Sequence, residues 1–138
     1  MTNHVNNVVS AAFMKLRELY FYRRFLTKDS LVVLVHAFIT SRVDYCNGLF
    51  TGLPDVLLRK LQSVLNASAR LISGTRKHDH ITHVLKELHW LPVQQRIKFK
   101  LLLTVYKCLN GSAPLYLRRR LNLVNNPKLR SSVNCSSI

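Results

Sequence analysis

The chain has 138 residues, 48% of them apolar, and its 21 Lys and Arg against 6 Asp and Glu give a formal net charge of +15. The length suits one domain, and the apolar share excludes a chain that is disordered by composition. Because so large a charge repels itself, it favours a polyanionic partner, with nucleic acid first and an anionic membrane surface second.

The first predicted helix covers residues 5–26. Apolar side chains at helical spacing form one stripe along it, which is typical of a helix that faces a core. The residues expected on that stripe are Val5, Val9, Ala12, Phe13, Leu16 and Tyr20. Residues 27–30, "TKDS", end the helix, and we expect Asp29 or Ser30 to cap the next one.

Two further helices are predicted before residue 75. The second covers residues 31–50, and its expected inner residues are Leu31, Leu34, Val35, Phe38, Tyr45 and Leu49. The stretch "TGLP" then breaks the chain. The third helix covers residues 54–73, with Pro54 in its first turn and Gly74 as a left-handed C-cap.

Three shorter or less regular segments complete the chain. Thr82 is expected to cap a short helix that ends near His89, Pro92 opens a helix that Gly111 ends, and Pro114 opens a last helix to about residue 124. Strict two-residue alternation is absent, so no strand is expected. The sequence predicts an all-α, compact bundle of about six helices without a sheet, in a domain of residues 1–122 with a flexible tail at 123–138.

The best-patterned helices should share a core. The expected core residues are Leu61, Val64, Leu65, Ile97, Leu101 and Val105. They occupy the apolar arcs of the third helix and of the helix that follows Pro92. Lys98 falls inside the second of these arcs, so its side chain must extend outward or end the packing there.

Basic residues gather on narrow ridges of these same helices. Arg96, Lys100 and Lys107 lie within about 40° of one another around one helix, and Arg59 and Arg70 share a polar stripe on the other. These cations could be ordinary solvated faces, but no Glu pairs with them at i, i+4 as on a merely solubilising face. The predicted nucleic-acid-binding residues are Arg59, Arg70, Arg96, Lys100, Lys107, Arg118, Arg119 and Arg120.

Catalytic and metal-binding patterns are missing from the sequence. Residues 78–83 hold three histidines around Asp79, and we favour a polar loop over a zinc site because no cysteine is nearby. There is no glycine-rich phosphate loop, no nucleophile elbow and no pair of acids placed for metal-dependent phosphoryl transfer. We therefore expect no catalytic residues, metal or cofactor, and expect Asp44 to pair with a nearby Arg.

The sequence also constrains the compartment. Its longest apolar runs are far shorter than the roughly 18 residues that cross a bilayer, and its N-terminus lacks the pattern of a secretory signal. Cys46, Cys108 and Cys135 form no CxxC spacing and are expected to be buried or inert thiols of a reducing compartment. These features predict a soluble intracellular protein, nuclear or cytoplasmic.

Three phrases in order carry a resemblance to a known family. They are "LVHAFITSRVDYCNGLFTGLP", "LLRKLQSVLNASARLISGTRKHDHIT" and "LHWLPVQQRIKFKLLLTVYKCLNGSAPLYL", followed by "LRSS" near the C-terminus. Together they resemble LINE-type, non-LTR retrotransposon polyproteins, in the region after the reverse transcriptase palm. The resemblance implies a helical thumb and the segment that follows it, which in such polymerases grips the RNA–DNA duplex of template and primer.

The chain also departs from that family. The metal-binding aspartates of the palm belong to a region upstream of the matching phrases, and His83 stands where the resemblance would place a proline. We expect a fragment, a decayed copy or a co-opted remnant that is not an enzyme and that binds RNA, DNA or their hybrid by the backbone. The alternative is an orphan helical protein-interaction module or a pseudogene product without retained nucleic-acid function, whose exposed apolar surface pairs with a protein or with itself.

Overall fold

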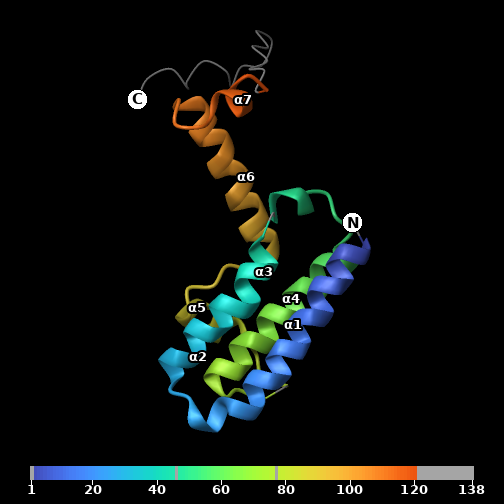
Figure 1. Ribbon diagram of the computed structural model, residues 1–138, viewed down its shortest axis with the longest axis vertical. Coiled ribbons are helices and arrows are strands. Elements are labelled where there is room, and N and C mark those ends of the chain that lie inside the picture. Colours follow the sequence, from blue (N-terminus) through green and yellow to red (C-terminus); the bar gives the residue numbers. More distant parts are fainter. Residues whose placement is uncertain (1, 46, 77, 121–138) are drawn as a thin grey trace. The chain divides into compact units, whose positions relative to one another are not determined.

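The computed structural model describes residues 2–45, 47–76 and 78–120. Within these residues every regular element is helical, which confirms the prediction of an all-α fold without strands (Figure 1). Contacts divide the chain into two units, residues 1–101 and residues 102–138, which we call the first and the second unit.

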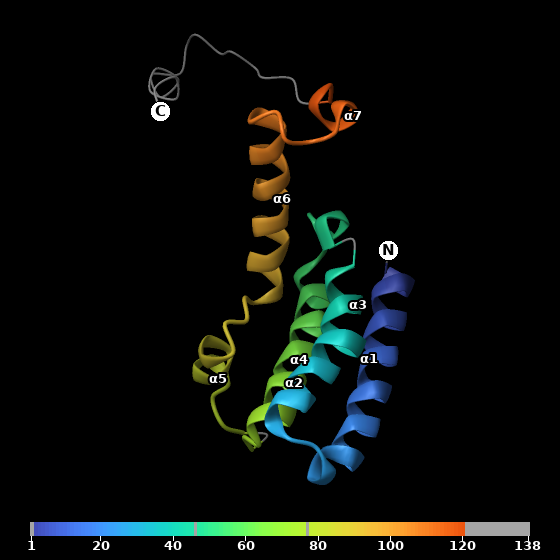
Figure 2. The same cartoon turned by 60° about the vertical axis from the view of Figure 1, so that its left-hand side comes forward.

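Three helical stretches form the body of the first unit (Figures 1 and 2). α1 (Thr2–Tyr22) and α4 (Asp55–Ser73) run in the same direction side by side. The stretch between them runs in the opposite direction and consists of α2 (Lys28–Val35), a π-helical turn (His36–Thr40) and α3 (Ser41–Asp44). Because this stretch is continuous, it counts as one of the six helical stretches that the sequence predicts.

Short elements complete the first unit. A 3-10 turn at Arg23–Phe25 follows α1, and a second one at Asn47–Phe50 precedes α4. α5 (Thr82–Glu87) packs against α4, and α6 (Val93–Leu109) begins in this unit.

One apolar core joins these elements. Its buried members on α4 are Leu57, Leu61, Val64, Leu65, Ala69, Leu71 and Ile72. They meet Val5, Ala12, Leu16 and Leu19 from α1 and Leu31, Val35, Ile39 and Val43 from the antiparallel stretch. Of the predicted core residues, Leu61, Val64, Leu65 and Ile97 are buried as expected.

The inner face of α1 differs from the prediction at two positions. Phe13 and Tyr20 are exposed, whereas their neighbours Ala12, which was predicted on the inner stripe, and Leu19, which was not, are buried. A shift of one residue turns a side chain by about 100° around the helix, which moves it from the core face to the flank. The prediction was therefore wrong for these two aromatic residues, whereas Leu16 lies in the core as expected.

The antiparallel stretch is not the regular helix that the sequence predicts. Phe38, Tyr45 and Leu49 are exposed, so their predicted inward placement was wrong. The buried residues follow a spacing of four instead, from Leu31 through Ile39 to Val43. In a regular α-helix, each residue of such a series would lie about 40° further around the helix axis than the one four positions before it. The π turn has more residues per turn, so it offsets this rotation and keeps the series on the core face.

The helix caps agree with the prediction only in part. Thr27, and neither Asp29 nor Ser30, caps α2, because the helix begins three residues earlier than expected and the Ser30 N–H donates to Thr27 Oγ1 at 3.2 Å. α5 has Ile81 at its N-cap without a side-chain bond, so Thr82 lies inside the first turn. It ends at Glu87, before His89, which has a φ of 54°.

Gly74 ends α4 in the left-handed conformation that the sequence predicts. Its φ is 79°, and its N–H donates to the Arg70 carbonyl at 2.9 Å. A Cβ at this position would lie 2.6 Å from Nη2 of Arg23, whose flexible side chain rests against the glycine. Glycine is therefore required by the backbone conformation more than by space.

Gly74→Ala is expected to lower the free energy of unfolding by about 1 to 2 kcal/mol, because a Cβ is strained in the left-handed region. Urea unfolding followed by circular dichroism measures the change. Gly48→Ala is the matched control, because nothing lies within 4 Å of the added Cβ there. An equal loss in both variants would contradict the assigned role of Gly74.

The packing of α6 is shorter than predicted. It contributes Val93 and Ile97 to the core, whereas Leu101 is 45% exposed and Val105 belongs to the second unit. The prediction that Leu101 lies in the core was therefore wrong, because this side chain is exposed, whereas the placement of Val105 in the same core stays a prediction. Lys98, next to Ile97, is exposed.

The second unit is described to residue 120. α6 ends at Leu109, two residues before Gly111, which has a φ of 74°. The N–H groups of Ser112 and Ala113 donate to the Lys107 carbonyl at 3.0 and 3.1 Å. α7 (Leu115–Arg118) follows Pro114. The rest of its predicted length, the boundary at 122 and the tail lie outside the described residues. No helix in the described part of the chain combines the length and the apolar character needed to cross a bilayer.

Candidate nucleic-acid interface

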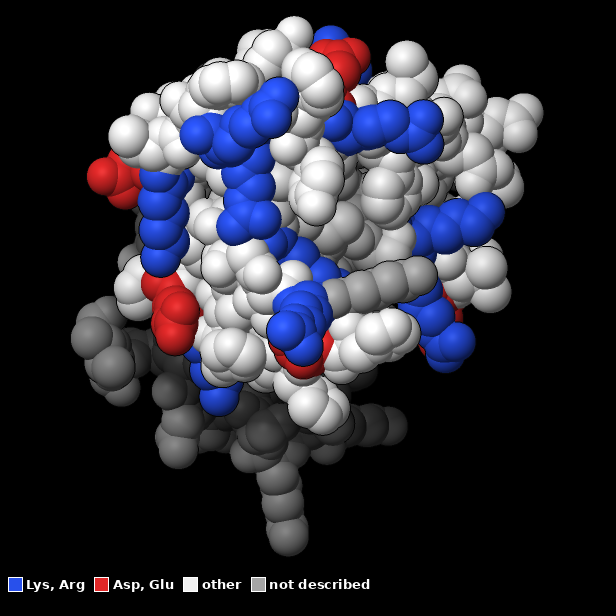
Figure 3. All heavy atoms as spheres, turned by 90° about the horizontal axis from the view of Figure 1, so that it is seen from below, with Lys and Arg blue, Asp and Glu red and all other residues white. Residues whose placement is uncertain are grey.

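Charge is distributed unequally along the chain. All six acidic residues lie in the first unit, whereas residues 102–138 contain six Lys and Arg and no acid. Figure 3 looks at the end of the first unit where α1 and α4 finish, and Lys and Arg side chains are spread over that face, with Asp and Glu side chains in smaller number among them. Both units therefore offer cations to a polyanion.

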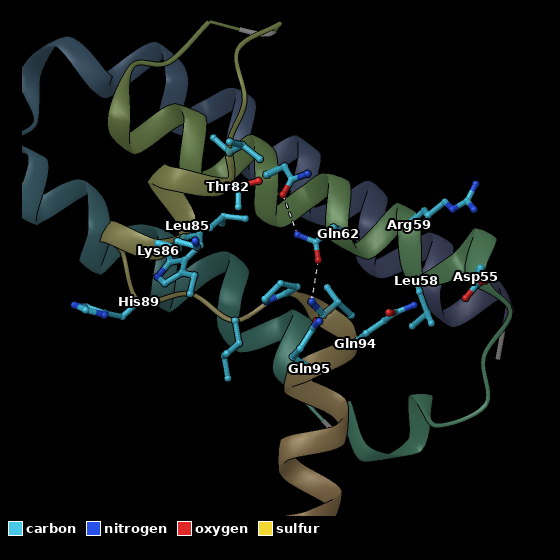
Figure 4. A pocket seen from close by; sticks show the side chains of 16 residues that line it. Asp55, Leu58, Arg59, Gln62, Thr82, Leu85, Lys86, His89, Gln94 and Gln95 are labelled. Carbon is cyan, nitrogen blue, oxygen red and sulfur yellow. Dashed lines mark hydrogen bonds between the residues drawn. The ribbon is translucent and has the colours of Figure 1, made fainter.

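A groove of about 810 Å³ lies in the first unit between α4, α5, residues 88–92 and the start of α6 (Figure 4). Its basic residues are Arg59, Lys86 and His89, and Leu58 and Leu85 are among its apolar ones. Its remaining polar lining consists of Asp55, Gln62, Asn66, Thr82, Gln94 and Gln95. Such a lining offers cations and amide donors beside an apolar surface.

Gln62 joins two walls of this groove. Its Oε1 accepts the Val93 N–H at 2.8 Å, and its Nε2 donates to Asn66 Oδ1 at 2.9 Å (Figure 4). The Val93 N–H belongs to the first turn of α6, which has no partner within its own helix. Gln62 thus satisfies that donor from α4 and fixes the start of α6 against it. No local sequence pattern predicts this bond, since the partners are 31 residues apart.

The predicted ridge on α4 is divided between two places. Arg59 is exposed and lines the groove together with Asn66. Arg70 does not line it: its Nη2 donates to the Asp79 carbonyl at 3.3 Å, and its Nε is buried without a hydrogen-bond partner among the described residues. The structure therefore brings Arg59, but not Arg70, into this groove.

Arg96 has a structural role that its position on the predicted ridge does not reveal. Its Nη1 lies 2.6 Å from Oδ2 of Asp44, its Nε donates to the Leu91 carbonyl at 2.7 Å, and its guanidinium lies 6.0 Å from the centre of the Trp90 ring. Its side chain is only 13% exposed. This confirms the prediction that Asp44 pairs with a nearby Arg, and the contact of Arg96 with nucleic acid stays a prediction.

Arg96→Met is expected to lower the free energy of unfolding by about 1 to 2 kcal/mol, because it leaves the Asp44 carboxylate and the Leu91 carbonyl without their donor. The loss stays moderate because the Asp44 side chain is 37% exposed and water can solvate it. Thermal or urea unfolding measures it. Lys98→Met removes an exposed cation from the same helix and should have little effect. Equal losses would exclude the assigned role of Arg96.

The other predicted cations are at the surface. Lys100 and Lys107 are exposed on α6, and Arg118, Arg119 and Arg120 are exposed at the end of the described chain. Tyr116 beside them is also exposed. Lys86 and His89 were not predicted, because each stands alone in the sequence and meets Arg59 only through the packing of α5 on α4.

The histidine-rich loop behaves as a polar loop. His78, His80 and His83 are exposed, and the Asp79 carboxylate accepts the Arg76 backbone N–H at 3.1 Å. Over residues 2–45, 47–76 and 78–120, no group of three His, Cys, Asp or Glu side chains is placed to hold a metal ion. Cys108 is a buried free thiol, as expected, whereas Cys46 and Cys135 lie outside the described residues.

The groove and the exposed cations can hold an anionic backbone by charge and by amide donors. The groove walls are fixed from within, because Gln62 and Arg96 tie the start of α6 to α4 and α3. Comparison with protein-family models, curated proteins and solved structures finds no match to this chain.

Proposed function

We propose that the chain is a non-catalytic module that binds the backbone of RNA, DNA or their hybrid duplex, as its resemblance to the thumb and post-thumb region of LINE-type reverse transcriptases implies. The observation that carries this proposal is the separation of charge. Nine Lys and Arg follow Glu87 in the sequence and no acid does. An intracellular location, nuclear or cytoplasmic, belongs to the same proposal.

An ordinary solvated helix face has a different charge pattern. On α1, Lys15 Nζ lies 2.7 Å from Glu18 Oε2, one turn away. By contrast, residues 98–120 contain no Asp or Glu that could pair with Lys107 or with the run Arg118, Arg119 and Arg120. Such unbalanced cations attract phosphates, and binding then releases the counterions that the phosphates had condensed.

The groove supports the same function in the first unit. Arg59 and Lys86 provide charge, and the amides of Gln94 and Gln95 provide donors for phosphate or sugar oxygens. None of these groups requires a particular base. The proposed binding is therefore independent of sequence, and a bilayer is not a proposed partner.

Fluorescence anisotropy of the full chain with labelled RNA–DNA hybrid, duplex DNA and single-stranded RNA tests this function. Affinity should fall steeply with salt, with a slope of log affinity against log salt of about −0.9 for each phosphate neutralised on duplex DNA. A scrambled sequence of the same length should bind equally well. Absence of binding at low salt, or an affinity that does not respond to salt, would contradict the proposal.

A second candidate function is a protein-interaction module. The supporting observation is that α6 exposes Leu102, Tyr106 and Leu109 at 67%, 64% and 54%, with spacings of four and three residues. Such a stripe on one helix face is typical of a surface that pairs with a protein or with a second copy. Sedimentation velocity separates this candidate from the first. A dimer that Tyr106→Ser dissociates, together with absent nucleic-acid binding, would favour it.

A further inference from the structure

A second cavity, of about 690 Å³, lies in the first unit where α1 and α4 end. Four arginines line it: Arg17 from α1, Arg23 from the 3-10 turn, Arg70 from α4 and Arg76 from the following loop. None of the described residues that line it is acidic.

Little inside the protein neutralises these four charges. In the part of the chain that the structure describes, the guanidinium groups of Arg17, Arg23 and Arg76 make no ion pair or hydrogen bond. Arg70 donates to a neutral carbonyl, and its buried Nε has no partner there. Of the acids nearest in sequence, Glu18 pairs with Lys15. The Asp79 carboxylate lies beside the pocket, where it accepts the Arg76 backbone N–H, but among the described residues it forms no ion pair with any of the four guanidinium groups.

The shape of the cavity strengthens its electrostatic attraction. Leu16, Ala67 and Leu71 contribute apolar walls, which exclude water and focus the field of the arginines. Gly74, which has no side chain, allows the Arg23 guanidinium to lie directly against the backbone. The cavity is therefore concave, positive and partly apolar, whereas Arg118, Arg119 and Arg120 are exposed cations of a helix end.

Aromatic rings stand at the same cavity. Phe13 and Tyr20 both line it and both are exposed, although their helix has an apolar core face. An exposed ring beside arginines is a platform for a nucleobase, because every base has a π-face that can stack. The positions that the sequence analysis wrongly assigned to the core thus become available to a ligand.

We propose that this arginine pocket binds a phosphomonoester attached to a nucleobase, as in the phosphorylated end of a nucleic acid or a free mononucleotide. A phosphomonoester has a charge of about −1.5 to −2 at neutral pH and three acceptor oxygens, whereas a phosphodiester within a chain has a charge of −1. Four guanidinium groups in one cavity match the greater charge and the larger number of acceptors. The nucleic-acid source of this group rests on the proposed function, and the mononucleotide source does not.

Binding of the full chain to three oligonucleotides of one sequence, carrying a 5′-phosphate, a 3′-phosphate or hydroxyls at both ends, tests the pocket. One phosphorylated end should bind about tenfold more tightly or better than the hydroxyl form, and adenosine 5′-monophosphate should compete where adenosine does not. Binding of adenosine 5′-monophosphate without a preference among oligonucleotides would support the mononucleotide source. Equal affinities together with no binding of adenosine 5′-monophosphate would overturn the proposal.

Arg17→Gln/Arg76→Gln should remove the phosphate preference. Both arginines are exposed, so neither change disturbs the core. Lys28→Gln/Arg42→Gln removes the same charge from exposed positions outside the pocket and should retain the preference. A preference that survives in the first variant overturns the pocket assignment. Failure of the proposed function would appear separately, as loss of salt-dependent binding to the hydroxyl-ended oligonucleotide.

Discussion

Leu61→Ala is expected to lower the free energy of unfolding by about 2 to 5 kcal/mol, the usual cost of removing a fully buried leucine and leaving a cavity. Leu61 is 0% exposed at the middle of α4, where α1 and the antiparallel stretch pack against that helix. A domain of this size has a total stability of about 5 to 15 kcal/mol, so the change removes a large share of it.

Urea unfolding followed by circular dichroism at 222 nm measures the loss. Val56→Ala on the same helix is the matched control, because Val56 is exposed and its truncation should change stability by less than about 0.5 kcal/mol. A loss below 1 kcal/mol for Leu61→Ala would mean that α4 does not lie at the centre of the core.

Arg118→Gln/Arg119→Gln/Arg120→Gln should reduce the dependence of nucleic-acid affinity on salt. If all three arginines contact phosphates, the slope of log affinity against log salt should become shallower by about 2 to 3 units, and affinity at physiological salt should fall on the order of 100-fold. The loss should be the same for every sequence, because phosphate contacts do not read bases. These three arginines are a better test than a set that includes Arg96. Replacing Arg96 would break its ion pair with Asp44 and so change the stability of the fold as well as the charge.

A triple variant of the first unit, Lys15→Gln/Lys28→Gln/Arg42→Gln, removes the same charge and should have a smaller effect. Lys15 in particular is already paired with Glu18. Should the arginine variant stay folded and keep both its affinity and its salt slope, the run Arg118 to Arg120 is an ordinary solvated face, and the protein-interaction function becomes the better supported one.

α4 shows how far local sequence information reaches in this fold. Its apolar residues follow the period of an α-helix without interruption, Pro54 precedes it and Gly74 ends it, so both its length and its buried face were predictable. The buried face of the antiparallel stretch was not predictable, because its buried residues are four positions apart and only the π turn keeps them on one side of the helix. Leu101 looked like a core residue because its own helix is apolar there, and no local pattern tells where the neighbouring helices stop.

The candidate site was predictable where chemistry is local and unpredictable where it depends on packing. The sequence indicated that Asp44 needs a basic partner, but only the fold identifies that partner as Arg96, 52 residues away. In the arginine pocket, Arg17 and Arg76 come from α1 and the loop after α4, and each alone looks like a solvated cation. Their common surface exists only because α1 and α4 end at the same side of the bundle.

The π turn has a consequence for how this region tolerates insertions and deletions. Loss of one residue between His36 and Thr40 would leave a continuous α-helix, yet it would rotate every later residue of the stretch by about 100°. Val43 would leave the core and Asp44 would turn away from Arg96, although neither residue had been changed. A single codon in this turn therefore sets the register between the bundle and the start of α6.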